Sequence, residues 1–258
     1  MALYDRIGIG YDTTRRVDPY LLSRLLHHLE PSAGARYLDV GCGTGNYTIA
    51  MSQAGVSICG VDLSPTMLAQ ARDKPLLAEW VRGDVLALPF RDASFAGATM
   101  TFVHHHVSDR VAGFREIRRV LGPSGKLVLL NGTAEQTRHF WLVEYFPRVI
   151  EQAASSCSQA ETEAALAEAG FSIKTIEVYE VADDLKDRFL YSGKHRPELY
   201  LDPRVRAGIS AFACAHDQNE IDQGVERLTG DICTGQISSV IHQYGWAGGD
   251  YTFTVAAR

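Results

Sequence analysis

Three glycines at alternating positions are the first residues in the chain whose spacing suggests chemistry. Gly41, Gly43 and Gly45 follow the apolar segment RYLDV, and the segment after them has the pattern of a helix that ends near Gly55. Glycine lets the backbone turn sharply, and it lets main-chain amides approach a ligand without obstruction by a side chain. The order strand, tight loop, helix predicts a ligand-binding loop, although a tight turn without a ligand would have the same pattern.

Two aspartates stand at the ends of the next two predicted strands. Asp62 ends SICGVD, where its carboxylate can accept hydrogen bonds from the hydroxyls of a ribose. Asp84 follows EWVRG, where it can accept a bond from an adenine amino group while the amide of Val85 meets a ring nitrogen. The alternatives are structural. Asp62 could cap the next helix, for which Ser64 is better placed, and Asp84 could be an ordinary turn residue.

The order of strand and helix patterns predicts an α/β fold. Apolar strands alternate with helices, which is typical of a parallel sheet with helices on both faces. An insertion at about 183–249 separates the last two β-rich segments and is long enough to cover a site. We expect strands at 36–40, 57–63, 79–84, 95–102, 126–131, 173–181 and 251–257, and helices at 110–121, 219–230 and 237–244. Further helices are expected to begin at Asp18-Pro19, at Asn46, at Ser64-Pro65 and at the capping box formed by Ser158 and Glu161.

The motifs LDVGCGTG, VDLS, GDVLALPF and RRVLGPSGKLVLLN, which span roughly residues 37–131, resemble the successive motifs of class I S-adenosylmethionine-dependent methyltransferases. The resemblance implies a Rossmann-like, doubly wound sheet of seven strands, mostly parallel with the last strand antiparallel, and a helical insertion between the last two strands. We expect one domain, 1–258, with an N-terminal lid and helix at 1–30, a donor-binding core at 31–135 and substrate-side elements at 136–258.

The same resemblance implies a set of donor-binding residues. The glycine loop with Asp39 would hold the methionine end, Asp62 the ribose, and Asp84 with Val85 the adenine. In relatives a leader folds over the donor, so we expect Tyr11 and Arg15 to close the site; the alternative is a flexible tail. The full set implied for S-adenosylmethionine is Tyr11, Arg15, Asp39, Gly41, Cys42, Gly43, Gly45, Asp62, Leu63, Met67, Gly83, Asp84, Val85, Thr101 and Phe102.

Three consecutive histidines follow the fourth predicted strand. If the acceptor is a hydroxyl or a protonated nitrogen, a base must remove a proton, and histidine titrates near neutral pH. His105 and His106 are the candidates, although the histidines could equally serve only to shape the loop. A metal site is not expected, because consecutive side chains diverge. We expect His139, Trp141, Glu144 and Tyr145 to lie on one helix. Trp141, Tyr145 and Arg196 are hypotheses for the acceptor pocket, with packing in the core as the alternative explanation.

Composition limits the classes of function. The net charge of -6 and the absence of a Lys/Arg block argue against a nucleic-acid partner. The five cysteines lack zinc spacing, and neither a signal peptide nor an apolar run long enough for a membrane span is evident, so we expect a cytoplasmic protein, as a monomer or homodimer, with no membrane partner. The predicted function is transfer of a methyl group from S-adenosylmethionine to a small-molecule acceptor. The alternative is a non-catalytic or regulatory protein that binds S-adenosylmethionine.

Overall fold

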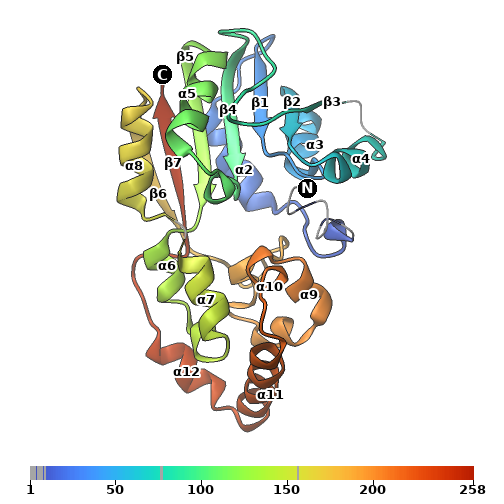
Figure 1. The fold of residues 1–258 in the computed structure, drawn as a ribbon, viewed down its shortest axis with the longest axis vertical. Helices are drawn as coiled ribbons and strands as arrows, with labels where there is room; N and C mark the ends of the chain where they lie inside the picture. Colours follow the sequence, from blue (N-terminus) through green and yellow to red (C-terminus); the bar gives the residue numbers. More distant parts are fainter. Residues whose placement is uncertain (1–3, 5–7, 9, 76–77, 156) are drawn as a thin grey trace.

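A seven-stranded sheet forms the upper half of the molecule (Figure 1). The computed structural model describes residues 4, 8, 10–75, 78–155 and 157–258. The strands lie in the order β3-β2-β1-β4-β5-β7-β6, and β7 runs antiparallel to both of its neighbours while the other pairings are parallel. This arrangement confirms the predicted fold class. The strands are β1 (Arg36–Val40), β2 (Ser57–Asp62), β3 (Glu79–Arg82), β4 (Phe95–Thr101), β5 (Leu121–Asn131), β6 (Ser172–Tyr179) and β7 (Tyr251–Ala257).

The central strands β1, β2 and β4 are largely buried on both faces because helices cover both. Successive side chains of a strand point to opposite faces, so Tyr37 of β1 joins one core and Leu38 the other. The first core contains residues of α2 (Pro19–Leu29) and α3 (Asn46–Gln53). The second contains residues of α5 (Arg110–Val120) and α8 (Gln159–Glu168), and α4 (Pro65–Arg72) packs against β2 and β3.

The helix starts expected from the sequence are confirmed by their caps. The side chain of Asp18 accepts hydrogen bonds from the amides of Tyr20 and Leu21, and proline occupies the first turn. Ser64 accepts from the amide of Met67, and Ser158 forms a complete capping box with Glu161. Each cap satisfies amides that have no partner inside the helix, which fixes where α2, α4 and α8 begin.

A second, helical half lies beyond the carboxyl ends of the parallel strands (Figure 1). Its elements come from two stretches of chain, one between β5 and α8 and the other between β6 and β7. They pack on the first core, which continues from the sheet into this half. The elements are α6 (Ala134–Arg138), η3 (Trp141–Glu144), α7 (Pro147–Ala154), η4 (Leu190–Gly193), η5 (Pro197–Leu201), α9 (Pro203–Ala207), α10 (Ser210–Ala213), α11 (Gln218–Thr234) and α12 (Ile237–Gln243).

One sequence-based expectation about this half is wrong. His139, Trp141, Glu144 and Tyr145 do not share a helix. A capping box of Thr133 and Gln136 starts α6 early, and that helix ends before His139. The chain then forms the short helix η3, and Pro147 begins the next helix. None of the helices in the described part of the chain has the length and apolar content that a membrane span requires.

Candidate functional site

The glycine loop joins β1 to α3 and is tied to the end of β2. The amides of Gly41 and Cys42 donate to the carbonyl of Val61, at 2.8 and 3.1 Å. Gly41 and Gly43 have φ angles of 70° and 56°, which side chains rarely adopt. A Cβ atom on Gly41 would also stand 2.5 Å from the side chain of Val103, which follows β4. The loop can therefore lie close to the end of β4 only with glycine at position 41.

Gly45 has a structural role that differs from the predicted one. It is the N-cap of α3, with a φ angle of 76°, and a Cβ atom there would lie 2.2 Å from the Trp80 ring. Gly45 does not line the cavity described below, whereas all the other predicted donor-binding residues do. The third glycine therefore lets the loop pack on β3 and takes no part in the cavity wall.

Asp39 is buried behind the loop, with 3% of its surface exposed. Its carboxylate accepts hydrogen bonds from the hydroxyls of Thr48, at 2.5 Å, and Thr99, at 3.0 Å. Burial raises the pKa of Asp39 to about 6, and the two threonine hydroxyls act in the opposite direction. Asp39 consequently places a negative charge at the back of the cavity at neutral pH.

Asp62 holds the loop from the tip of β2. One carboxylate oxygen accepts from the amide of Gly43 and the other from the amide of Ser64, both at 2.8 Å. A carboxylate oxygen can accept more than one hydrogen bond, so this role is compatible with binding a hydroxyl of a ligand. Asp84 lines the same cavity, and its Oδ1 accepts from the amide of Leu86 at 3.0 Å. Asp84 therefore makes the hydrogen bond expected of an ordinary turn residue, and it also lines the cavity.

The N-terminal segment closes the cavity from the opposite side. Nε of Arg15 lies 2.5 Å from Oδ1 of Asp187, which belongs to the insertion, and Nη1 of Arg15 donates to the Tyr11 hydroxyl at 2.7 Å. Burial acts to lower the pKa of Arg15, but Asp187 outweighs it and holds that pKa above its usual value. The carboxylate of Asp12 accepts hydrogen bonds from the Thr44 hydroxyl, at 2.5 Å, and from the side-chain amide of Asn46, at 2.9 Å. These bonds fix the N-terminal segment on the glycine loop and the start of α3.

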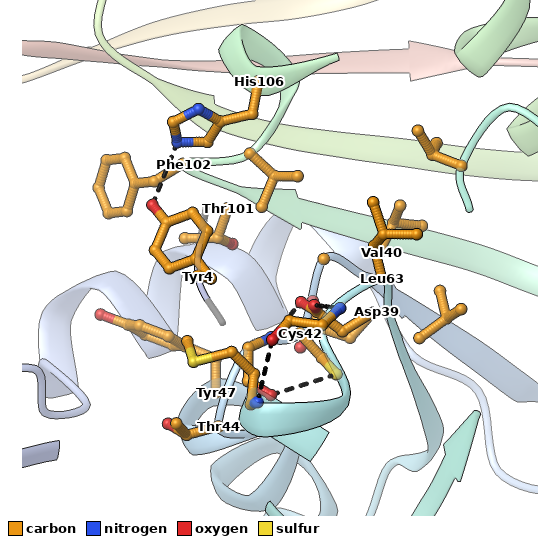
Figure 2. Close-up of a pocket in the computed structure, with 18 of the residues that line it drawn as sticks. Tyr4, Asp39, Val40, Cys42, Thr44, Tyr47, Leu63, Thr101, Phe102 and His106 are labelled. Atoms are coloured by element: carbon orange, nitrogen blue, oxygen red, sulfur yellow. Dashed lines mark hydrogen bonds between the residues drawn. The ribbon is translucent and has the colours of Figure 1, made fainter. Parts of the chain in front are cut away.

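Parts of the predicted N-terminal lid, residues 1–3, 5–7 and 9, lie outside the described residues. Tyr4 is described, and its ring lies over the loop that follows β4 (Figure 2). Its hydroxyl is 3.1 Å from Nε2 of His106, and the two rings meet edge to face. Burial raises the pKa of Tyr4, so its hydroxyl keeps its proton at neutral pH.

The end of β4 is strained in a way that positions an aromatic ring. Phe102 has a φ angle of 56°, which is an outlier for a bulky residue. Its amide donates to the carbonyl of Leu130 at 2.8 Å, and its ring packs on Phe189 and Tyr251, with centroid distances of 4.6 and 5.1 Å. One segment of the helical half, with Phe189, and the strands β5 and β7 thus hold the strained residue in place.

The three histidines have different surroundings. His104 is buried, with Nε2 3.0 Å from Sγ of Cys157, and burial lowers its pKa to about 4. It fixes the loop to the segment before α8. The rings of His105 and His106 pack on each other with centroids 4.0 Å apart. Desolvation lowers the pKa of both, further for His105, so both are neutral at pH 7. Within the described residues, no group of three or more potential metal ligands comes together.

Two adjacent cavities meet at these residues. The first has a volume of about 380 Å³ and is lined by the glycine loop, the ends of β2 and β4, and the N-terminal segment. The second, of about 310 Å³, lies between the end of β4 and the helical half. Both volumes are at the small end of the range for small-molecule sites. Four residues line both cavities and form the boundary between them: Tyr4, Arg15, Phe102 and His106.

The structure does not bring the three predicted acceptor residues to either cavity. Trp141 and Tyr145 are buried in the core, where the Trp141 indole donates to the carbonyl of Lys194 and the Tyr145 hydroxyl donates to Asp231. Arg196 donates to the carbonyl of Leu185. These side chains hold the helical half together, which agrees with the alternative explanation that they pack in the core. Their positions do not support contact with an acceptor in either cavity.

Comparison with known proteins agrees with this architecture. Residues 38–129 match the model of a family described as a methyltransferase domain. The chain is 30% identical over 164 residues to the demethylmenaquinone methyltransferase of Corynebacterium glutamicum strain ATCC 13032, an alignment that covers 61% of this chain and 70% of that protein. A crystal structure from Anabaena variabilis, described as a methyltransferase from an antibiotic biosynthesis pathway, has 30% identity and a TM-score of 0.84, with 93% of this chain and 98% of that chain covered. The chain belongs to the class I S-adenosylmethionine-dependent methyltransferases.

The malonyl-[acyl-carrier protein] O-methyltransferase of Erwinia pyrifoliae is 32% identical over 143 residues, which is 54% of this chain. Here the chain spans only 55% of the relative's own length. The match to the family model, residues 38–129, ends before the helical half begins. The similarity to the Anabaena variabilis structure extends over both halves, since it covers 93% of this chain.

The first cavity fits the donor that this family uses. It offers a loop without side-chain obstruction, carboxylates at the tips of adjacent strands, and apolar side chains for a base, among them Leu63, which is 50% exposed. The sequence prediction missed Asp187, Asn46 and Tyr47, which also line this cavity. Asn46 and Tyr47 could have been found from their position in the first turn after the loop. Asp187 has no signal in the sequence, because only the tertiary fold brings it to Arg15.

Proposed function

We propose that this methyltransferase binds S-adenosylmethionine in the first cavity and transfers its methyl group to a small-molecule acceptor in the second. The observation that carries the proposal is the shared boundary: two cavities of small-molecule size meet at Tyr4, Arg15, Phe102 and His106. A transfer reaction needs donor and acceptor in contact and in line, with water excluded. The shared lining residues support contact between donor and acceptor. The buried rings of Phe189, Tyr191 and Tyr251 beside them support the exclusion of water.

The donor residues follow from the contacts of the first cavity. When bound, S-adenosylmethionine supplies a methyl group already activated by a sulfonium. Asp39 and the glycine loop would hold the amino-acid end, which carries an ammonium and a carboxylate group, and Asp62 the ribose hydroxyls. Asp84 and Val85 would hold the base, with Leu63 and Met67 beside it. The remaining residues of the proposed set are Tyr11, Arg15, Cys42, Gly83, Thr101 and Phe102, all in the same wall.

His106 is our candidate for the base. It lies at the boundary of the cavities, and its Nε2 faces the Tyr4 hydroxyl (Figure 2). The lowered pKa of His106 leaves the ring neutral at pH 7, so it can take a proton from an acceptor hydroxyl or amine. His105 lines only the second cavity, and its pKa is lower still. We assign it to contact with the acceptor and to support of the His106 ring.

We further propose that residues 1–258 act as one domain. Residues 1–30 would serve as the lid, 31–135 as the donor core and 136–258 as the substrate side. The contact between Arg15 and Asp187 supports this, since it joins the lid to the insertion. All five cysteines are free thiols, which supports a reducing compartment, and we propose the cytoplasm. A monomer or a homodimer would be compatible with a site built from a single chain.

The test is transfer of a labelled methyl group. The full chain is incubated with methyl-labelled S-adenosylmethionine and a small-molecule extract, and products are followed by mass gain. We expect donor-dependent labelling of an extract component with release of S-adenosylhomocysteine. Binding of the donor without labelling of any component would instead favour a non-catalytic binding protein.

A further inference from the structure

The described residues that line the second cavity carry an unbalanced positive charge. Two guanidinium groups line it, those of Arg15 and Arg110, and no Asp or Glu side chain is among its described lining residues. The charge of Arg15 is matched by Asp187, as described above. Arg110 therefore decides the electrostatic character of this cavity.

The guanidinium of Arg110 has no close acceptor in the described part of the chain. Its Nε atom is buried and forms no hydrogen bond, and its guanidinium takes part in no ion pair there. Asp109 precedes Arg110 in the chain, and the pKa of Glu161 is lowered by hydrogen bonds from Ser158 and, to a smaller extent, by the charge of Arg110. Both acids serve as helix caps. Asp109 caps α5 by accepting from the amide of Ala112 at 2.9 Å, and Glu161 accepts from the amide and hydroxyl of Ser158 at 2.7 and 3.0 Å. A buried donor without an acceptor carries an energetic cost that a ligand can remove.

The rest of the wall is aromatic and rigid. Phe102, Phe189, Tyr191 and Tyr251 line the cavity and pack on one another, with centroid distances between 4.6 and 5.1 Å. Tyr251 meets the other three rings edge to face, and Phe102 and Phe189 are tilted against each other. Three of them are at least nine-tenths buried, with Phe189, Tyr191 and Tyr251 at 4%, 2% and 5% exposed. Fixed aromatic walls favour a flat, apolar ligand, because aromatic pairs gain from contact and little side-chain freedom is lost on binding.

We propose that the second cavity takes an aromatic acceptor that carries a carboxylate, and that Arg110 binds this carboxylate. The inference rests on the proposed function and narrows its acceptor class. The planar fork of a guanidinium matches the two oxygens of a carboxylate, and a single unpaired cation balances one negative charge. Arg110 lines the second cavity and not the first. The carboxylate would thus lie away from the donor, which leaves the other end of the ring system for the boundary with Tyr4 and His106.

The test uses a matched pair of probes that differ in charge. Binding of 4-hydroxybenzoate and of 4-hydroxybenzamide to the full chain is measured by ligand-observed NMR, with and without S-adenosylhomocysteine, and phenyl phosphate serves as a second anion. We expect 4-hydroxybenzoate to bind at least tenfold more tightly than its amide. Equal binding of the acid and the amide, or tighter binding of the phosphate, would overturn the assignment of a carboxylate.

Three variants separate the role of Arg110 from folding. Arg110→Met should lower the affinity for 4-hydroxybenzoate at least tenfold, to that of the amide, while the affinity for S-adenosylhomocysteine stays within twofold. Arg110→Lys keeps the positive charge but loses the planar guanidinium. Its affinity for 4-hydroxybenzoate should lie between those of the unmodified chain and Arg110→Met. Arg115→Met, on the exposed face of the same helix, should behave as the unmodified chain. If Arg110→Met still binds 4-hydroxybenzoate more tightly than 4-hydroxybenzamide, the proposal is wrong. Failure of S-adenosylhomocysteine to bind, with the preference for the acid intact, would count against the proposed function alone.

Discussion

The guanidinium of Arg15 and the carboxylate of Asp187 form a buried ion pair that joins the N-terminal segment to the insertion. Their side chains are 11% and 2% exposed, and the closest atoms are 2.5 Å apart. Because both charges are largely removed from water, the loss of either partner leaves the other uncompensated. This pair fixes the position of the segment that closes the first cavity.

We predict that Asp187→Ala lowers the free energy of unfolding by about 3–5 kcal/mol, the usual cost of breaking a buried pair. A double-mutant cycle of Arg15→Ala and Asp187→Ala, measured by urea unfolding, should give a coupling above about 1.5 kcal/mol. The exposed pair of Arg115 and Glu168, at 3.1 Å and with both side chains more than half exposed, is the control. Its coupling should stay below about 1 kcal/mol. Equal coupling for the two pairs would contradict this account.

Removal of the carboxylate at the tip of β2 should weaken donor binding. We predict that Asp62→Ala raises the dissociation constant of S-adenosylhomocysteine by about tenfold to a hundredfold, since a hydrogen bond to a charged group contributes roughly 1.5–3 kcal/mol. The released amide of Gly43 adds to the loss. Asp183→Ala, at an exposed carboxylate of the insertion, is the control and should have no effect. An unchanged dissociation constant in Asp62→Ala would show that Asp62 does not bind the donor.

The proposed base predicts a pH dependence of turnover. Desolvation lowers the pKa of His106 below its usual value near 6.5. A base works in its unprotonated form, so the rate should be level at pH 7 to 8 and should fall as the pH drops through this lowered pKa. In His106→Gln the acidic limb should disappear and kcat should fall by about 10²–10⁴-fold. An acidic limb that survives in His106→Gln would show that a different group titrates.

The position of Gly45 against Trp80 predicts that alanine substitutions at Gly45 and at Gly55 differ in their effect on stability. Gly45 and Gly55 both have positive φ angles, 76° and 89°, so an alanine at either position is strained. Only at Gly45 would the new Cβ meet another atom, 2.2 Å from Trp80, whereas Gly55 has nothing within 4 Å. We predict that Gly45→Ala is less stable than Gly55→Ala by about 1–3 kcal/mol in urea unfolding, the range for overpacking. Equal losses would show that Trp80 moves aside at no cost.

Much of the donor half could be predicted from sequence because its signals are local. A capping residue followed by proline marks the start of α2 at Asp18 and the start of α4 at Ser64. The parallel order of strands then brings the tips that carry Asp62 and Asp84 to the same edge of the sheet as the glycine loop. The number of strands and the antiparallel direction of β7 came from the family resemblance, which local patterns alone do not supply.

The helical half was predicted less well, for a physical reason. Helical spacing identifies an apolar face but not what that face packs against, so Trp141 and Tyr145 were hypotheses for a pocket and prove to be core residues. Within the insertion, α11 and α12 were expected, while α9, α10 and the 3-10 helices are too short to leave a periodic pattern. The contact between Arg15 and Asp187 depends on the whole fold and has no counterpart in local sequence.

Isothermal titration of the unmodified chain with S-adenosylhomocysteine measures donor binding itself. We propose that the first cavity holds an adenosyl compound with a charged amino-acid end. We predict saturable binding of one molecule per chain, with competition by S-adenosylmethionine and no effect of a nicotinamide dinucleotide. A folded chain that shows no heat of binding and no competition at millimolar concentrations of either compound would contradict the account.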